Sequence, residues 1–116
     1  MIQSLPPKGF APEWAAAWNS HDLPRILSHY TEDVRFRSEK ARLFGGSPEI
    51  IGKAALRAYW QAALEAQPGL HFRVTQSYRG PGVMVITYLN QNDVRTAETL
   101  VFDDGGRITF GAACHA

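Results

Sequence analysis

The segment 95–102 limits the possible folds more than any other part of this chain. It reads Arg-Thr-Ala-Glu-Thr-Leu-Val-Phe, and its Thr, Val and Phe residues favour a β-strand. Successive side chains of a strand point to opposite faces, which gives two sets: Thr96, Glu98, Leu100 and Phe102, and Ala97, Thr99 and Val101. Neither set is typical of a water-facing surface, and strands that are apolar on both sides are normally covered on both. The segment therefore predicts a strand covered on both faces.

Glu98 is unusual in such a strand, because a carboxylate is rarely buried without a partner. Two interpretations remain open. In the first, Glu98 forms a structural ion pair with an Arg or Lys of a neighbouring strand. In the second, it projects into a cavity, where its pKa is tuned for proton transfer or where burial keeps it protonated as a hydrogen-bond donor.

The C-terminal part of the chain predicts an antiparallel meander. Four strand-like segments follow one another, separated by Gly, Pro, Asn, Gln and Asp residues: 70–78, 83–89, 94–102 and 107–114. The separators are rich in turn-forming residue types, and short turns of this kind join neighbouring antiparallel strands.

The N-terminal part predicts helices that each have one apolar face. Trp14, Ala17 and Trp18, for example, have helical spacing. In order, the sequence predicts an irregular arm, two helices, a strand, a long loop and a third helix: 1–10, 12–19, 23–30, 34–38, 39–51 and 52–67. A loop of this length in a compact domain is often a lid or the wall of a site.

Composition excludes several classes of function. The 116 residues fit one domain, and 12 Lys and Arg against 11 Asp and Glu give no electrostatic pattern for nucleic acid or an anionic membrane. The single cysteine, Cys114, excludes an internal disulfide framework and is predicted to be a small buried hydrophobe. The four histidines lack metal-binding spacing. We therefore expect a cytoplasmic protein with no metal or other cofactor and no nucleic-acid or membrane partner.

The predicted elements combine into a single α+β domain over residues 1–116. Each helix has one apolar face, so the helices must cover one face of a curved sheet. A curved sheet around a long helix forms a cone, and the open end of a cone is a natural pocket for a small molecule. The outer sheet face also carries apolar residues such as Ala97 and Val101. They predict a homodimer that forms through that face.

Several motifs resemble the nuclear transport factor 2-like superfamily, and in particular its SnoaL-like and ketosteroid isomerase-like branch. The motifs are Ala-Trp-Asn-Ser-His-Asp at 17–22, Tyr-Thr-Glu-Asp-Val-Arg-Phe at 30–36, Gly-Lys-Ala-Ala-Leu-Arg-Ala-Tyr-Trp at 52–60, and Leu-Val-Phe at 100–102 leading to Gly-Arg-Ile at 106–108. The resemblance implies a cystatin-like α+β barrel, in which a cone-shaped mixed sheet wraps around three N-terminal helices. It also implies a pocket and commonly a homodimer. Members include isomerases, cyclases, dehydratases, epoxide hydrolases and binding proteins without catalysis.

The resemblance also implies which residues surround the pocket. Four groups of ketosteroid isomerases, a base, an oxyanion-hole tyrosine, a supporting tyrosine and an oxyanion-hole acid, fall in that order on Ser38, Trp14, Trp60 and Glu98. Of these four residues, only Glu98 has the same chemical type as the ketosteroid isomerase group that it matches. Ser38 is not a useful base without a neighbour that takes its proton, and Glu39 could replace it only if the loop turned Glu39 inward. We do not expect ketosteroid isomerisation by the familiar route.

The aromatic residues allow a cage around a flat ligand or a plain hydrophobic core. We expect Trp18 and Tyr59 mainly in the core, and His115 at a pocket rim or a dimer contact. The predicted pocket lining comprises Trp14, Tyr30, Phe36, Trp60, Thr96 and Leu100.

Two functions remain open on this sequence. The first is a small-molecule pocket protein of the SnoaL-like type that carries out isomerase- or cyclase-like proton chemistry on an apolar cyclic ligand through Glu98, without a cofactor. The second is a non-catalytic ligand-binding or dimerisation module. The sequence names neither the substrate nor the reaction, and it leaves open whether the chain is an enzyme at all.

Overall fold

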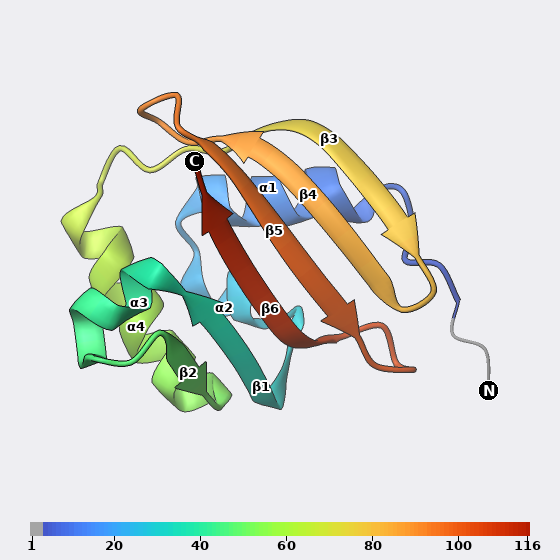
Figure 1. Cartoon of the computed structure of the whole chain (residues 1–116), viewed down its shortest axis with the longest axis horizontal. Helices are drawn as coiled ribbons and strands as arrows, with labels where there is room; N and C mark the ends of the chain where they lie inside the picture. The colour runs from blue at the N-terminus through green and yellow to red at the C-terminus, as the bar shows by residue number, and fades with distance from the viewer. Residues whose placement is uncertain (1–3) are drawn as a thin grey trace.

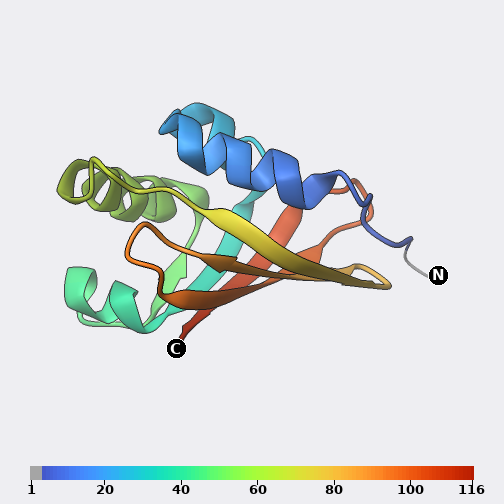
Figure 2. The same cartoon turned by 90° about the horizontal axis from the view of Figure 1, so that it is seen from above.

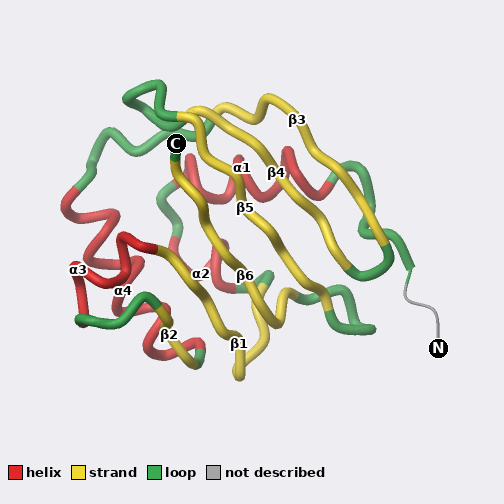
Figure 3. The backbone as a smooth tube through the Cα atoms, viewed as in Figure 1, coloured by secondary structure: helices red, strands yellow, loops and turns green. Residues whose placement is uncertain are grey.

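Six strands form one mixed sheet in the computed structural model, which describes residues 4–116 (Figure 1). Their bounds are β1 (Tyr30–Ser38), β2 (Glu49–Ile51), β3 (Arg73–Gly80), β4 (Val83–Leu89), β5 (Arg95–Phe102) and β6 (Ile108–His115). The strand order across the sheet is β2-β1-β6-β5-β4-β3 (Figure 3). Strands β3 to β6 form the predicted antiparallel meander, and β1 pairs in parallel with β6, which makes the sheet mixed.

In the described part of the chain four helices accompany the sheet: α1 (Phe10–Ser20), α2 (Leu23–Leu27), α3 (Glu39–Gly45) and α4 (Lys53–Ala66). Helices α1, α2 and α4 lie on one side of the sheet, and α3 lies at its end near the C-terminus (Figure 2). This layered α+β arrangement confirms the predicted fold class. Of the predicted irregular arm, residues 1–3 lie outside the described residues, and α1 already begins at Phe10.

Local chemistry explains where the first helices end. His21 adopts a left-handed conformation with φ 59°, which terminates α1. The Asp22 side chain accepts a hydrogen bond from the backbone N–H of Arg25, so it caps α2 as the sequence predicts. Helix α2 is shorter than predicted because Tyr30 already pairs with Ile108 as the first residue of β1.

The prediction of a loop over residues 39–51 is wrong, because the segment contains α3 and β2. The Ser38 side chain accepts a hydrogen bond from the backbone N–H of Lys40 and caps α3, and Gly46 ends it with φ 80°. The following strand β2 pairs with β1, which places Ile50 opposite Phe36. Gly and Pro residues indicated a loop here, whereas they mark the boundary between two short elements.

The side chains of β5 are divided as predicted. Thr96, Glu98, Leu100 and Phe102 are buried against the helices, and the alternate residues are half-buried on the outer face. The same alternation in β6 corrects the prediction for Cys114, which is exposed on the outer face because His115 occupies the inner one. Within residues 4–116, no helix is long and apolar enough to cross a membrane.

Candidate functional site

A cavity of about 80 Å³ lies between α4 and the inner face of the sheet. Aromatic rings form much of its wall: Trp18, Phe36, Tyr59, Trp60, Phe72 and Tyr88. Polar side chains complete it, with Glu98 among them. The wall is continuous with the core, since Trp60 makes edge contacts with Trp18 and Phe36 at ring-centre distances of 4.8 and 5.4 Å. The site is therefore a cavity whose wall combines aromatic rings with several polar side chains, and such a combination suits a small-molecule pocket.

Glu98 lies in the middle of the sheet, between Ile86 of β4 and Ala113 of β6. Its residue surface is only 7% exposed. The Tyr88 hydroxyl donates to Glu98 Oε1 at 3.4 Å, and no Lys, Arg or His forms an ion pair with Glu98 within residues 4–116. The interpretation of Glu98 as half of a structural ion pair thus receives no support, and the geometry fits the cavity interpretation.

Burial controls the protonation of Glu98. The loss of water around the carboxyl group raises its pKa to about 8, and the hydrogen bond from Tyr88 opposes this only in part. The pKa of Tyr88 and that of Tyr30 are also raised, mainly by burial and further by the Glu98 charge, so both tyrosines stay neutral. At neutral pH Glu98 is therefore mostly a carboxylic acid, poised to exchange its proton close to the working pH.

This shift predicts how the free energy of unfolding depends on pH. Because the folded-state pKa of Glu98 lies above the unfolded value, the folded protein holds more protons between about pH 4.5 and 8, and stability falls as pH rises through that range. Urea unfolding at pH 5 and pH 9 measures this effect. Between these pH values the wild-type protein should lose a few kcal/mol more of its free energy of unfolding than Glu98→Gln loses. The same pH dependence in both proteins would contradict the assignment of the raised pKa to Glu98.

The structure brings together five of the residues singled out in the sequence. Ser38, Phe36, Trp60, Thr96 and Glu98 all line the cavity.

Trp14, Tyr30 and Leu100 are buried in the core and do not belong to the lining. The indole N–H of Trp14 donates to the Tyr30 hydroxyl at 3.3 Å, and its ring stacks on Phe72 with 5.6 Å between ring centres. Trp14 thus supports the cavity wall from behind.

Sequence reasoning missed several lining residues, and one of them, Tyr88, carried a usable signal. Tyr88 pairs with Thr96 across β4 and β5, so the alternation of β4 already places it on the inner face. Trp18 has the same helical face as Trp14, but spacing along a helix gives the face and not the distance from a cavity. The indole N–H of Trp18 is buried, and it has no hydrogen-bond acceptor among residues 4–116.

Neither Ser38 nor Glu39, the residues at the expected position of the base, is placed to act as one. Ser38 is buried, and the Tyr59 hydroxyl lies against its side chain. Glu39 does not turn inward: its carboxylate accepts from Arg42 Nε at 2.8 Å and is exposed. The described structure therefore leaves Glu98 as the carboxyl group that lines the cavity.

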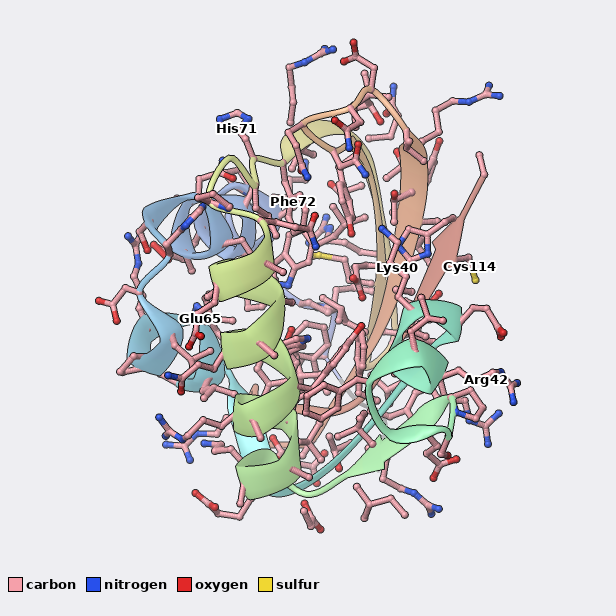
Figure 4. All side chains as sticks on the ribbon, turned by 90° about the vertical axis from the view of Figure 1, so that its left-hand side faces the viewer. Lys40, Arg42, Glu65, His71, Phe72 and Cys114 are labelled. Atoms are coloured by element: carbon pink, nitrogen blue, oxygen red, sulfur yellow. The ribbon has the colours of Figure 1, made fainter. Side chains whose placement is uncertain are left out.

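Lys40 and His115 lie at the end of the cavity next to α3 and the last residues of β6. Figure 4 looks at this end of the molecule, with Phe72 beside α4 and Lys40 above α3, while Cys114 points away at the outer side of the sheet. Burial lowers the pKa of His115, and the Lys40 charge lowers it further, so the imidazole is neutral at pH 7. Within residues 4–116, no group of three or more His, Cys, Asp or Glu side chains is arranged to hold a metal ion.

Comparison with known proteins places this chain in a family. The family model of the SnoaL-like domain matches residues 11–115. No functionally curated protein matches the sequence. A crystal structure of a SnoaL-like protein of unknown function from Burkholderia thailandensis is 33% identical, with a TM-score of 0.89 over 94% of this chain and 93% of that one.

More distant structures share the fold. A putative polyketide cyclase from Sinorhizobium meliloti is 16% identical, with a TM-score of 0.74 over 88% of this chain and 90% of that one. A hypothetical protein from Catenulispora acidiphila with a ketosteroid isomerase-like fold is 18% identical, with a TM-score of 0.75 over 94% of this chain and 86% of that one. The predicted resemblance and fold are thus confirmed, and the chain belongs to the SnoaL-like family.

Proposed function

We propose that this SnoaL-like protein binds a cyclic, largely apolar small molecule in the cavity and moves a proton on it through Glu98. The observation that carries this proposal is a buried carboxyl group, without an ion-pair partner among residues 4–116, whose pKa of about 8 lies close to neutral pH at an aromatic cavity wall. Perturbed carboxyl groups in a cavity are candidates for acid–base catalysis. The similarity to a protein named putative polyketide cyclase agrees with this class of chemistry.

Proton transfer by one carboxylate accounts for both isomerase- and cyclase-like chemistry. As the carboxylate, Glu98 removes a proton from a carbon next to a ligand carbonyl, which leaves an enolate and a carboxylic acid. Return of that proton to a different carbon completes an isomerisation. Attack of the enolate carbon on a second carbonyl of the same ligand instead closes a ring, and the proton then passes to the new alkoxide. Neither route needs a further reactant.

Tyr88 supplies the second polar group that such chemistry requires. Its hydroxyl lies 3.4 Å from Glu98 Oε1 and stays protonated, because burial raises its pKa. A neutral hydroxyl at this position can hold the carboxylate in one orientation, and once Glu98 has taken up the proton the same O–H can donate to negative charge that develops beside it. This arrangement favours catalysis over the alternative of a non-catalytic binding or dimerisation module.

Tryptophan fluorescence tests whether the cavity binds a ligand. Because Trp18 and Trp60 line it, we expect saturable quenching or a spectral shift with a ligand drawn from steroids, aromatic polyketides, terpenoids, fatty acids and single-ring aromatic compounds. The Trp60→Phe variant should lose part of the response, and free tryptophan amide controls for absorption by the ligand. If the folded protein shows no fluorescence change with any compound in the panel, the result would count against the cavity as a ligand site.

A homodimer through the outer sheet face is part of the proposal. Residues of that face, such as Thr99 and Val101, are half-buried in the single chain, and Tyr78 is 59% exposed. We expect wild-type protein to sediment as a dimer and Thr99→Arg, which places a charge between Val85 and Ala112, to sediment as a monomer with an unchanged circular dichroism spectrum. The control Gln61→Arg on the exposed side of α4 should remain a dimer, and a wild-type monomer would refute this part.

A further inference from the structure

The register of the strands places the polar end of the cavity, formed by Lys40 and His115, relative to Glu98. Thr96 lies two residues before Glu98 on the same face of β5, which corresponds to about 7 Å along the strand. His115 is the cross-strand partner of Thr96 in β6, and Lys40 lies near His115, whose pKa its charge lowers. His115, with Lys40 near it, therefore lies one step of inward-facing residues further along the sheet than Glu98.

The positive charge of Lys40 has no carboxylate partner within residues 4–116. The neighbouring Glu39 is engaged by Arg42. Glu65, on α4, lies on the other side of that helix and does not line the cavity (Figure 4). Other polar lining residues are uncharged, among them the amides of Gln67, Asn90 and Gln91.

Glu98, the carboxyl group of residues 4–116 that lines this cavity, opposes an anion only weakly at neutral pH. Glu98 is mostly protonated below about pH 8, so it can donate a hydrogen bond and does not repel an acidic ligand. His115 is neutral and offers one ring nitrogen as a donor. The electrostatic character of the cavity is therefore set by the single charge of Lys40.

We propose, as a refinement that rests on the proposed function, that the cavity selects aromatic carboxylic acids, with the ring against the aromatic wall and the carboxylate at Lys40 and His115. An ammonium group attracts a carboxylate, and the more so where part of the surrounding water is displaced. The apolar wall binds the ring in a manner that does not depend on its charge. Selection for the acid over a neutral ligand of the same shape thus comes from the polar end.

The size of the cavity narrows the class further. Its volume of about 80 Å³ is below the roughly 150 Å³ of an engineered protein cavity that takes up benzene. A single ring therefore enters only in part, with its substituted edge left at the open end, whereas two fused rings require larger movements of the wall side chains. The inference is thus specific to single-ring acids.

Titrations with matched acid and amide pairs test this selection. We would measure dissociation constants at pH 7 by NMR for benzoate, benzamide, 2-naphthoate and 2-naphthamide with the wild-type protein, Lys40→Gln, Lys40→Arg and the control Lys8→Gln. Lys8 is exposed in the N-terminal arm and does not line the cavity, so its substitution removes the same charge elsewhere.

We expect benzoate to bind roughly five-fold more tightly than benzamide and more tightly than 2-naphthoate, since Lys40 is exposed and an exposed charge pair contributes little more than this. Lys40→Gln should abolish the preference for the acid, chiefly because benzoate binds more weakly, while Lys40→Arg and Lys8→Gln should retain the preference. Equal binding of acid and amide, an unchanged preference in Lys40→Gln, or no binding of either benzene compound overturns the inference. Saturable binding of a neutral ligand in the fluorescence panel would, in each of these cases, leave the proposed function standing.

Discussion

Replacement of Glu98 by Gln should abolish turnover of any ligand that the protein converts, with a loss of about 10²- to 10⁴-fold in kcat. The amide keeps the shape and hydrogen-bonding capacity of the protonated acid, but it can neither remove nor return a proton. Ligand affinity near pH 7 should change by less than about three-fold, because Glu98 is mostly uncharged there. Wild-type kcat should rise with pH and level off above about pH 8, since the carboxylate is the base.

Two further variants make this result specific. Glu39→Gln changes the exposed carboxylate next to Ser38, which the structure directs toward Arg42, and should leave kcat unaffected. Tyr88→Phe removes the donor that partly lowers the pKa of Glu98, so the pH at which kcat levels off should move upward. Wild-type turnover in Glu98→Gln, or a loss caused equally by Glu39→Gln, would falsify the assignment of Glu98.

Replacement of Trp14 by Ala should cost about 3–5 kcal/mol of the free energy of unfolding. The ring of Trp14 is 1% exposed and packs against Phe72 and Tyr88, and its N–H is the partner of the Tyr30 hydroxyl. The truncation therefore leaves both a void and a buried hydroxyl with one hydrogen bond fewer. Urea unfolding monitored by circular dichroism measures the loss.

The smaller substitution Trp14→Phe tests whether Trp14 only packs behind the cavity wall or also contacts a ligand. It keeps most of the ring volume and should cost only about 1–2 kcal/mol. Because Trp14 does not line the cavity, the folded variant should keep the ligand affinity of the wild-type protein. The same substitution at Trp60, which does line it, should weaken binding. A large loss of affinity in Trp14→Phe alone would show that Trp14 contacts the ligand after all.

The sequence by itself determined the fold and the face on which Glu98 lies. Alternation along 95–102 separates the inner from the outer set of side chains, because the period of a strand is two and does not depend on the rest of the chain. Turn residues between apolar segments likewise predict the meander of β3 to β6. The local signals failed where two weak elements share one segment, as over residues 39–51. At Cys114 the preference of cysteine for burial gave the wrong prediction, and the alternation of β6 places the side chain on the exposed outer face.

The tertiary structure alone decided which side chains surround Glu98. The helical spacing of Trp14 and Trp18 is the same, yet one supports the wall and the other forms it, because this depends on where α1 crosses the sheet. Lys40 lines the cavity because Ser38 caps a short helix, and no periodic pattern in the sequence predicts that helix. Even the pKa of Glu98 is a tertiary property, since the surrounding elements remove the water that would otherwise stabilise its charge.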